Sequence, residues 1–227
     1  MAIEDKFNLL KADLAQTLDL VQSRLSEGVR EETIYKGTIV FLSKLIHHPP
    51  FMFVGINPGA GVFKDTGKKP RDLDPADDGF EYVLAENNYD YALARETRGV
   101  FAETKFKSHL ENCVKTNLFY TCTSRASELC EFMDLVERNC GVNYWKKSVA
   151  WTKMMIDLIE PSAIICEGKF AIDRLASYYE LQVQWRDEIG SFLIDGQIEV
   201  IGYKRRYSHI RNRDSLMKAL NQMELPA

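Results

Sequence analysis

Four short segments, separated by stretches with helical periodicity, are the strongest indication of how this chain folds. Residues 51–56 form a continuous apolar run, and the segments 114–120, 163–166 and 198–203 resemble it. A continuous apolar run of this length, bounded by turn residues, is typical of a parallel strand that is buried on both faces. Strands that alternate with helices predict an α/β fold. We therefore expect a three-layer α/β/α sandwich whose mainly parallel central sheet has about four strands.

The helical stretches are recognised by apolar residues at gaps of three and four. Residues 4–26 predict an amphipathic N-terminal helix with Gly28 as its stop. A second helix is expected over 32–46, ended by His47-His48-Pro49-Pro50. The pair Asp195-Gly196 suits a tight hairpin turn that joins 192–194 to the last strand. Further helices are predicted over 104–112, 127–137, 145–159, 168–180 and 213–223.

The length and composition predict one globular domain covering residues 1–227, since 45% of the residues are hydrophobic and 27% are charged. Within it we expect a helical N-terminal segment, 1–48, and an insertion at about 64–96. The insertion is rich in Asp, Lys, Pro and Gly, and its weak periodicity favours a lid or flap. No apolar run is long enough to span a membrane, and the N-terminus lacks the layout of a secretion signal. We expect a cytoplasmic monomer.

The cysteine and histidine pattern gives little support for a metal centre or a cofactor. The five cysteines are odd in number, widely spaced and free of Cys-x-x-Cys pairs, which favours reduced, mostly buried thiols. The adjacent His47 and His48 are expected to face different ways and to be structural. We therefore expect no metal and no cofactor. The cysteines are Cys113, Cys122, Cys130, Cys140 and Cys166.

One basic stretch stands out from a chain whose net charge is −4. Residues 204–213 contain five Lys and Arg residues and no acid, which would place a phosphate-facing patch on an otherwise acidic body. A solvated surface turn explains the same composition. From charge alone both interpretations stay open. The five residues are Lys204, Arg205, Arg206, Arg211 and Arg213.

The loop Gly55-Ile56-Asn57-Pro58-Gly59 follows the first predicted strand, at the edge where parallel sheets bind ligands. Its glycines allow a backbone to approach a ligand closely. Asn57 offers one carbonyl acceptor and two amide donors, so it could hold a water or read a base edge. It cannot be a strong general base. The loop matches neither a dinucleotide fingerprint nor a P-loop, and an ordinary Asn-Pro turn is the alternative interpretation.

The order of these motifs resembles the uracil-DNA glycosylase superfamily, and most closely its mismatch-specific and single-strand-selective monofunctional branches. The Gly-Ile-Asn-Pro-Gly loop is followed by Lys-Thr-Asn-Leu at 115–118, by a strand with Glu-Gly-Lys at 167–169, and by a basic loop with one histidine. The resemblance covers about residues 51–220. It implies a site in which Asn57 positions the attacking water, Asn117 reads the amide edge of uracil and Phe101 stacks on the flipped base. It also implies that His209 faces the leaving uracil, that Arg211 lies at the wedge position, and that Gly55, Ile56, Pro58 and Gly59 line the substrate pocket.

The function implied by this resemblance is that of a monofunctional DNA glycosylase, which hydrolyses the N-glycosidic bond of uracil or a related damaged base. Its partner would be single-stranded or mismatched DNA. The final motif departs from the family, because His209-Ile210-Arg211 stands where His-Pro-Ser is usual. A catalytically inactive glycosylase-fold protein that binds nucleic acid or a nucleotide is therefore the alternative. An unrelated α/β hydrolase is a third interpretation, but no G-x-S-x-G elbow supports it. Glu103 and Glu167 lie near candidate loops without forming an acid/base couple.

Overall fold

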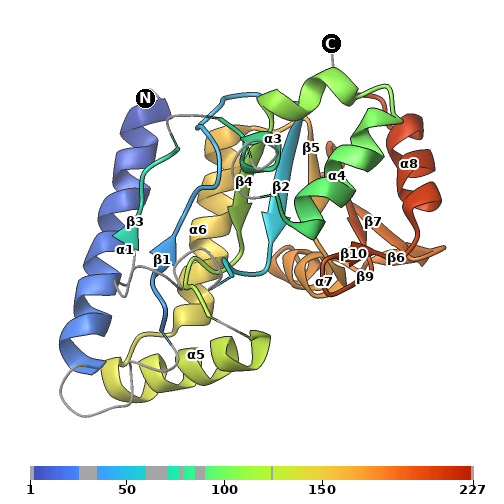
Figure 1. The fold of residues 1–227 in the computed structure, drawn as a ribbon. Helices are drawn as coiled ribbons and strands as arrows, with labels where there is room; N and C mark the ends of the chain where they lie inside the picture. Colours follow the sequence, from blue (N-terminus) through green and yellow to red (C-terminus); the bar gives the residue numbers. More distant parts are fainter. Residues whose placement is uncertain are drawn as a thin grey trace. The chain divides into compact units, whose positions relative to one another are not determined.

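The computed structural model describes residues 3–25, 35–59, 71–76, 79–84, 90–123 and 125–225, and it contains the predicted α/β fold (Figure 1). The chain forms two compact units. The sheet unit consists of residues 41–56, 75–117 and 160–227. The helical unit consists of residues 1–40, 57–74 and 118–159.

The sheet unit is built on a six-stranded sheet in the order β4-β2-β5-β8-β7-β6. The four predicted strands are confirmed, and they are the parallel part of this sheet. The first of them, β2, ends at the glycine that begins the candidate loop, and β4 ends at Asn117, three residues earlier than predicted. The parallel strands are β2 (Phe51–Gly55), β4 (Val114–Asn117), β5 (Ala163–Cys166) and β8 (Ile198–Tyr203).

Two antiparallel strands extend the sheet beyond β8. They are β7 (Ile189–Ile194) and β6 (Gln184–Arg186). The predicted hairpin between β7 and β8 is confirmed. Asp195 and Gly196 form its turn with φ angles of 49° and 69°, the positive values that a primed turn requires.

Helices cover both faces of the sheet within this unit, which confirms the layered architecture. On one face, Phe53, Ile165 and Ile201 are register neighbours and form a core with helices α4 (Ala92–Ala102) and α8 (Arg213–Gln222). On the other face, α7 (Lys169–Tyr178) lies so close to β8 that a Cβ at Gly202 would stand 2.7 Å from the Cβ of Ile172. The predicted helices at the positions of α7 and α8 are therefore present.

The helical unit contains α1 (Ile3–Leu25), α5 (Ala126–Cys140) and α6 (Tyr144–Ile159), all three at predicted positions. Asp13 of α1 accepts hydrogen bonds from Nζ of Lys147 and Nε1 of Trp151 on α6, each 2.7 Å long. Two short strands, β1 (Thr38–Ile39) and β3 (Arg71–Asp72), pair in parallel. The predicted stop at Gly28 lies outside the described residues.

The predicted helix over 32–46 is wrong in its described part, 35–46, so the segment 1–48 is not helical throughout. Thr38–Ile39 form β1, and the amide of Ile39 donates to the carbonyl oxygen of Tyr120 at 2.9 Å. The amide of Leu42 donates to the carbonyl oxygen of Lys115, also at 2.9 Å. Residues 38–41 are β-branched or aromatic and all four are buried, so extended pairing outweighs the helical spacing of the apolar side chains.

The predicted flap over 64–96 is also wrong where the structure describes it. Phe80, Tyr82 and Leu93 belong to the core of the sheet unit. Residues 81–84 form the short helix α3 (Glu81–Leu84), and α4 begins at Ala92 inside the supposed insertion. Short elements with few apolar residues leave no visible periodicity, which explains the error. Residues 64–70, 77–78 and 85–89 of this segment lie outside the described residues.

Three smaller predictions have clear outcomes. The helix predicted over 104–112 is a 3₁₀ helix, η2 (Lys107–Asn112). All five cysteines are free thiols, and three of them are buried, as expected. Within the described ranges, no helix combines the length and the apolar character that crossing a membrane requires.

Candidate functional site

The strand order places the candidate site at the carboxyl edge of the sheet. The chain runs from β2 to β4 on one side of it and then crosses to the opposite side of β2 to form β5. Such a change of direction opens a crevice outside the carboxyl ends of the strands, and open α/β sheets bind their ligands there. Gly55 ends β2 at this point, and Glu167 directly follows β5. The amide of Glu167 donates to the carbonyl oxygen of Val54 at 2.9 Å, which ties the two strand ends together.

Asn117 and Gly55 are register partners at this edge, and their fit is close. A Cβ added at Gly55 would lie 2.3 Å from Oδ1 of Asn117 and 3.3 Å from Oε2 of Glu167. A glycine is therefore required for both side chains to occupy the space above β2. Asn117 is only 4% exposed, and its buried Nδ2 has no hydrogen-bond partner in the described part of the chain. A buried donor without a partner costs about 1–3 kcal/mol of folding free energy, and a ligand that accepts a hydrogen bond from Nδ2 would remove this cost.

Glu167, which shares the space above Gly55 with this amide, belongs to a buried ionic cluster that the sequence interpretation did not detect. Nζ of Lys115 lies 2.7 Å from Oε2 of Glu81 and 3.7 Å from Oε2 of Glu167. The same Nζ lies 3.7 Å from the ring centroid of Tyr82, whose hydroxyl donates to Glu167. Burial, and then the Glu167 carboxylate, raise the pKa of Tyr82 well above its ordinary value, so the hydroxyl keeps its proton. Lys115 supplies the positive charge that faces both carboxylates.

Two signals in the sequence could have revealed this cluster. Lys115 interrupts an apolar run that reads as a buried strand, and a lysine is almost never fully buried unless it is paired. Glu167 stands directly after another such run. Each signal required a partner, and the partners Glu81 and Tyr82 lie in the segment that was interpreted as a flap.

Asn57 lies in the helical unit, where its amide orientation is fixed by hydrogen bonds. Its Nδ2 donates to Oγ1 of Thr123 at 2.9 Å and to the carbonyl oxygens of Thr121 and Pro58 at 3.2 Å. An isolated bridge between Gly59 and Thr123 holds the end of the same loop. Since Nδ2 is occupied, Oδ1 is the atom that can accept a hydrogen bond, and no described residue donates to it. An acceptor of this kind can orient a water molecule.

Phe101 lies in the core of the sheet unit. Its ring is 2% exposed and contacts Phe51 and Phe53, with ring centroids 5.6 and 5.7 Å apart. The cavity that Phe101 lines with Phe53 and Ile165 has a volume of about 10 Å³, which is less than a base needs. Stacking on a flipped base would require this ring to leave its core contacts. That role stays a prediction.

His209 stands on a small hairpin that follows the carboxyl end of β8. The hairpin pairs β9 (Arg205–Arg206) with β10 (His209–Ile210), and Tyr207 forms its turn with a φ of 56°. The His209 side chain is 68% exposed, and its Nδ1 lies 3.3 Å from Oε1 of Glu96 on α4. The histidine is therefore accessible to a ligand, and it has an acidic neighbour on the helix.

The five predicted basic residues divide into two groups. Lys204 lies 3.0 Å from Glu188, and Arg213 lies within 4.0 Å of both Glu96 and Glu103. These two charges are neutralised by nearby acids. In the described ranges, the remaining three form no ion pair, and Arg205 packs over Gly168 at the first turn of α7. The unpaired three are Arg205, Arg206 and Arg211.

Comparison with known proteins leaves the family open. No model of a known protein family matches the sequence, and no curated protein matches it. The resemblance to the uracil-DNA glycosylase superfamily therefore stays a prediction that rests on short motifs and on the placement of their residues.

Proposed function

We propose that the protein is a monofunctional DNA glycosylase that removes uracil or a related damaged base from DNA. The observation that carries this proposal is the buried, unpartnered amide of Asn117 beside Gly55, at the carboxyl edge of a parallel sheet. A side-chain amide offers a donor and an acceptor together, and this pair complements the alternating carbonyl and N–H groups on the edge of uracil. Enzymes that act on a base take it out of the stack and read its exposed edge in this way.

Two further residues named by the resemblance would supply the chemistry of the bond cleavage. Loss of the base leaves an oxocarbenium-like sugar and places negative charge on the departing uracil. Oδ1 of Asn57 would hold the water that attacks the sugar. His209 would donate to the developing charge, which lowers the barrier most effectively where water is excluded. Neither role requires a metal, a cofactor or a nucleophilic lysine.

The hairpin that carries His209 is a suitable contact for the DNA backbone. Arg206 and Arg211 are exposed, and the Tyr207 ring at the tip is 85% exposed. Unpaired guanidinium groups bind phosphates, and an exposed aromatic ring can stack on an unpaired base. These contacts favour single-stranded or mismatched DNA as the partner of a monomeric, cytoplasmic enzyme.

A second candidate function is nucleic-acid binding without cleavage. Two contacts of the free protein favour it. Phe101 packs in the core against Phe51 and Phe53, and His209 lies beside Glu96. Each residue would have to leave its contact before it could act on a base. The exposed arginines of the hairpin would still bind DNA. The two functions differ only in whether the glycosidic bond is broken.

Incubation with single-stranded and U:G oligonucleotides, followed by alkali, tests the proposal because alkali breaks the strand at abasic sites. We expect strand breaks with the wild-type protein and their loss in Asn57→Ala. Asn139→Ala is the matched control, since Asn139 is exposed on α5 and bonds only to a backbone oxygen one turn away. Salt-dependent DNA binding without any breaks would overturn the enzyme proposal and support the binding protein.

A further inference from the structure

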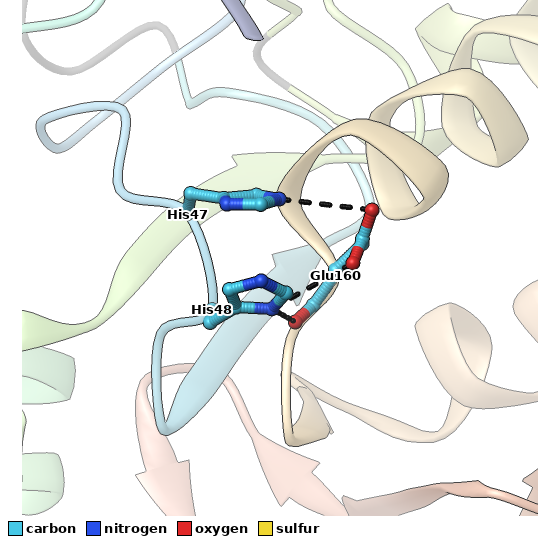
Figure 2. A group of neighbouring side chains, drawn as sticks. All are labelled: His47, His48 and Glu160. Atoms are coloured by element: carbon cyan, nitrogen blue, oxygen red, sulfur yellow. Dashed lines mark hydrogen bonds and ion pairs between the residues drawn. The ribbon is translucent and has the colours of Figure 1, made fainter.

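A second cluster of polar side chains lies at the amino edge of the sheet, opposite the candidate site. His47 and His48 precede β2, and Glu160 precedes β5. The two histidines were expected to face different ways, and this expectation is wrong. Both imidazole rings face the carboxylate of Glu160, with their centroids 3.7 Å apart (Figure 2). His48 makes this possible, because its φ of 55° turns the second ring onto the same side as the first.

The backbone of this cluster adopts a conformation that side chains disfavour. His48 and Glu160 have φ angles of 55° and 50°, in the left-handed region where glycine is usual. Glu160 occupies the position just past the end of α6, which is commonly a glycine in helices that end this way. Non-glycine residues in this region cluster at functional sites. His48 and Glu160 are two such residues, and their side chains face each other (Figure 2).

The distances in the cluster fit a shared ion better than direct hydrogen bonds. Nε2 of His47 lies 3.6 Å from Oε1 of Glu160, and Nδ1 of His48 lies 3.7 Å from Oε2. Both contacts are too long for good hydrogen bonds. Ligand atoms around a tetrahedral zinc ion stand about 3.3 Å apart, given metal–ligand bonds of about 2.0–2.1 Å. The three ligand groups offer donor atoms that all lie within 4.8 Å of one another, so only small side-chain movements are needed.

We propose that His47, His48 and Glu160 form a binding site for a divalent transition-metal ion of the zinc, cobalt or nickel type. Imidazole nitrogens suit these ions, whereas calcium and magnesium prefer a shell of oxygen ligands. The donor set is two imidazoles and one carboxylate, which leaves a position for water. Metal binding would replace the 3.3 Å contact between Nδ1 of His48 and the carbonyl oxygen of Glu160.

The position of this site assigns it a stabilising role and not a catalytic one. Phe51 and Ala163, the first residues of β2 and β5, are register partners, and the amide of Ser162 donates to the carbonyl oxygen of Pro49 at 3.0 Å. An ion bound by the histidines and Glu160 would add a second link between the segments that precede β2 and β5. The first and last residues of β2 are roughly 13 Å apart at about 3.3 Å per residue, so the ion would lie far from the carboxyl edge.

Titration of the full-length protein with Co²⁺ after treatment with a chelator tests this proposal directly. We expect one Co²⁺ per chain with a visible absorption band, displacement of that band by Zn²⁺, and a rise in Tm on binding. Glu160→Gln and His48→Asn should each weaken binding at least tenfold. Asn tolerates the left-handed backbone at position 48, so this variant removes the ligand with little strain.

Glu180→Gln is the matched control for Glu160→Gln. Glu180 is also an exposed glutamate just past a helix, and its φ of 57° is close to the 50° of Glu160. This control should bind Co²⁺ like the wild type. The proposal is overturned if the folded wild-type protein binds no Co²⁺ at a one-to-one ratio, or if Glu160→Gln and His48→Asn, folded by circular dichroism, both bind like Glu180→Gln.

Discussion

Nζ of Lys115 lies 3.7 Å from Oε2 of Glu167, and the two side chains are only 6% and 4% exposed. A buried charge that loses its partner keeps its desolvation cost, so removal of one member is strongly destabilising. We expect Lys115→Met to lower the free energy of unfolding by about 3 kcal/mol, because Glu81 and Glu167 would then face each other without a cation. Urea unfolding at neutral pH measures this change.

The matched control for Lys115→Met is Lys107→Met at an exposed position of η2. It should change stability by less than about 0.5 kcal/mol. If both variants unfold at the same urea concentration as the wild type, the buried lysine makes no important contribution to the fold.

Gly55→Ala tests the close approach between β2 and Asn117. The new Cβ would lie 2.3 Å from Oδ1 of Asn117, so the amide has to move out of its position. We expect a destabilisation of about 1–3 kcal/mol, as in other overpacked cores, together with loss of base excision. Gly99→Ala in α4 is the control, because the atoms nearest to its Cβ belong to the far end of the Arg213 side chain and not to a strand neighbour, and alanine favours a helix. Thermal unfolding that ranks the two variants in the opposite order would contradict the geometry.

Asp13 should make the stability of the helical unit depend on acid pH. Burial raises its pKa, but the hydrogen bonds from Lys147 and Trp151 outweigh this effect and hold it below the ordinary value. Because the folded pKa is the lower one, the contribution to stability is complete above the ordinary carboxyl pKa and disappears as the pH falls through the folded value.

For Asp13→Asn we expect a loss of about 1 kcal/mol at pH 7, since solvent screens a side chain that is 41% exposed. Denaturant unfolding at pH 7 and at acid pH should give a difference that shrinks in acid. Asp157→Asn, at an exposed position of α6, is the control for removal of a surface carboxylate, and it should change stability by less than about 0.5 kcal/mol. A difference that is constant with pH would show that the charge of Asp13 is not responsible.

The cysteines should differ sharply in their reaction with alkylating reagents. Cys130 is exposed, whereas Cys113, Cys122 and Cys166 are buried. Burial raises the pKa of all three buried thiols, to about 12 for Cys122, so little thiolate forms at pH 8. Peptide mass mapping after brief alkylation of the native protein should find Cys130 modified and these three protected until denaturant is added. Rapid modification of Cys166 would mean that β5 is not buried as described.

The centre of the parallel sheet could be predicted from sequence because two of its strands, β2 and β5, are continuous apolar runs. The local sequence of residues 51–56 and of residues 163–166 is sufficient to predict a strand that is buried on both faces. The hairpin turn at Asp195-Gly196 could also be predicted from the local sequence, because its residue types select the backbone conformation. Prediction of these elements required no knowledge of residues far away in the chain.

The errors fall where structure depends on distant partners. The segment from Ile39 to Leu42 has helical spacing, yet it is extended because its amides bond to Tyr120 and Lys115, which lie more than 70 residues further along the chain. Tyr82 looked like part of a polar insertion because its partner, Glu167, is 85 residues away. The sequence predicted the candidate site only as separate motifs. The ion pairs of the buried Lys115 could not be predicted, because its partners Glu81 and Glu167 come from distant segments of the chain.

The proposed role of the Asn117 amide in reading the base is tested by the single-turnover rate of uracil excision in Asn117→Asp. Aspartate has almost the same shape as asparagine, but its carboxylate only accepts hydrogen bonds, so it cannot donate to a uracil oxygen. Removal of one such donor is expected to slow excision by about 100-fold or more, with circular dichroism and Tm showing that the variant is folded. Excision by folded Asn117→Asp at the wild-type rate would contradict this role, and the absence of excision by the wild-type protein would contradict the proposed function itself.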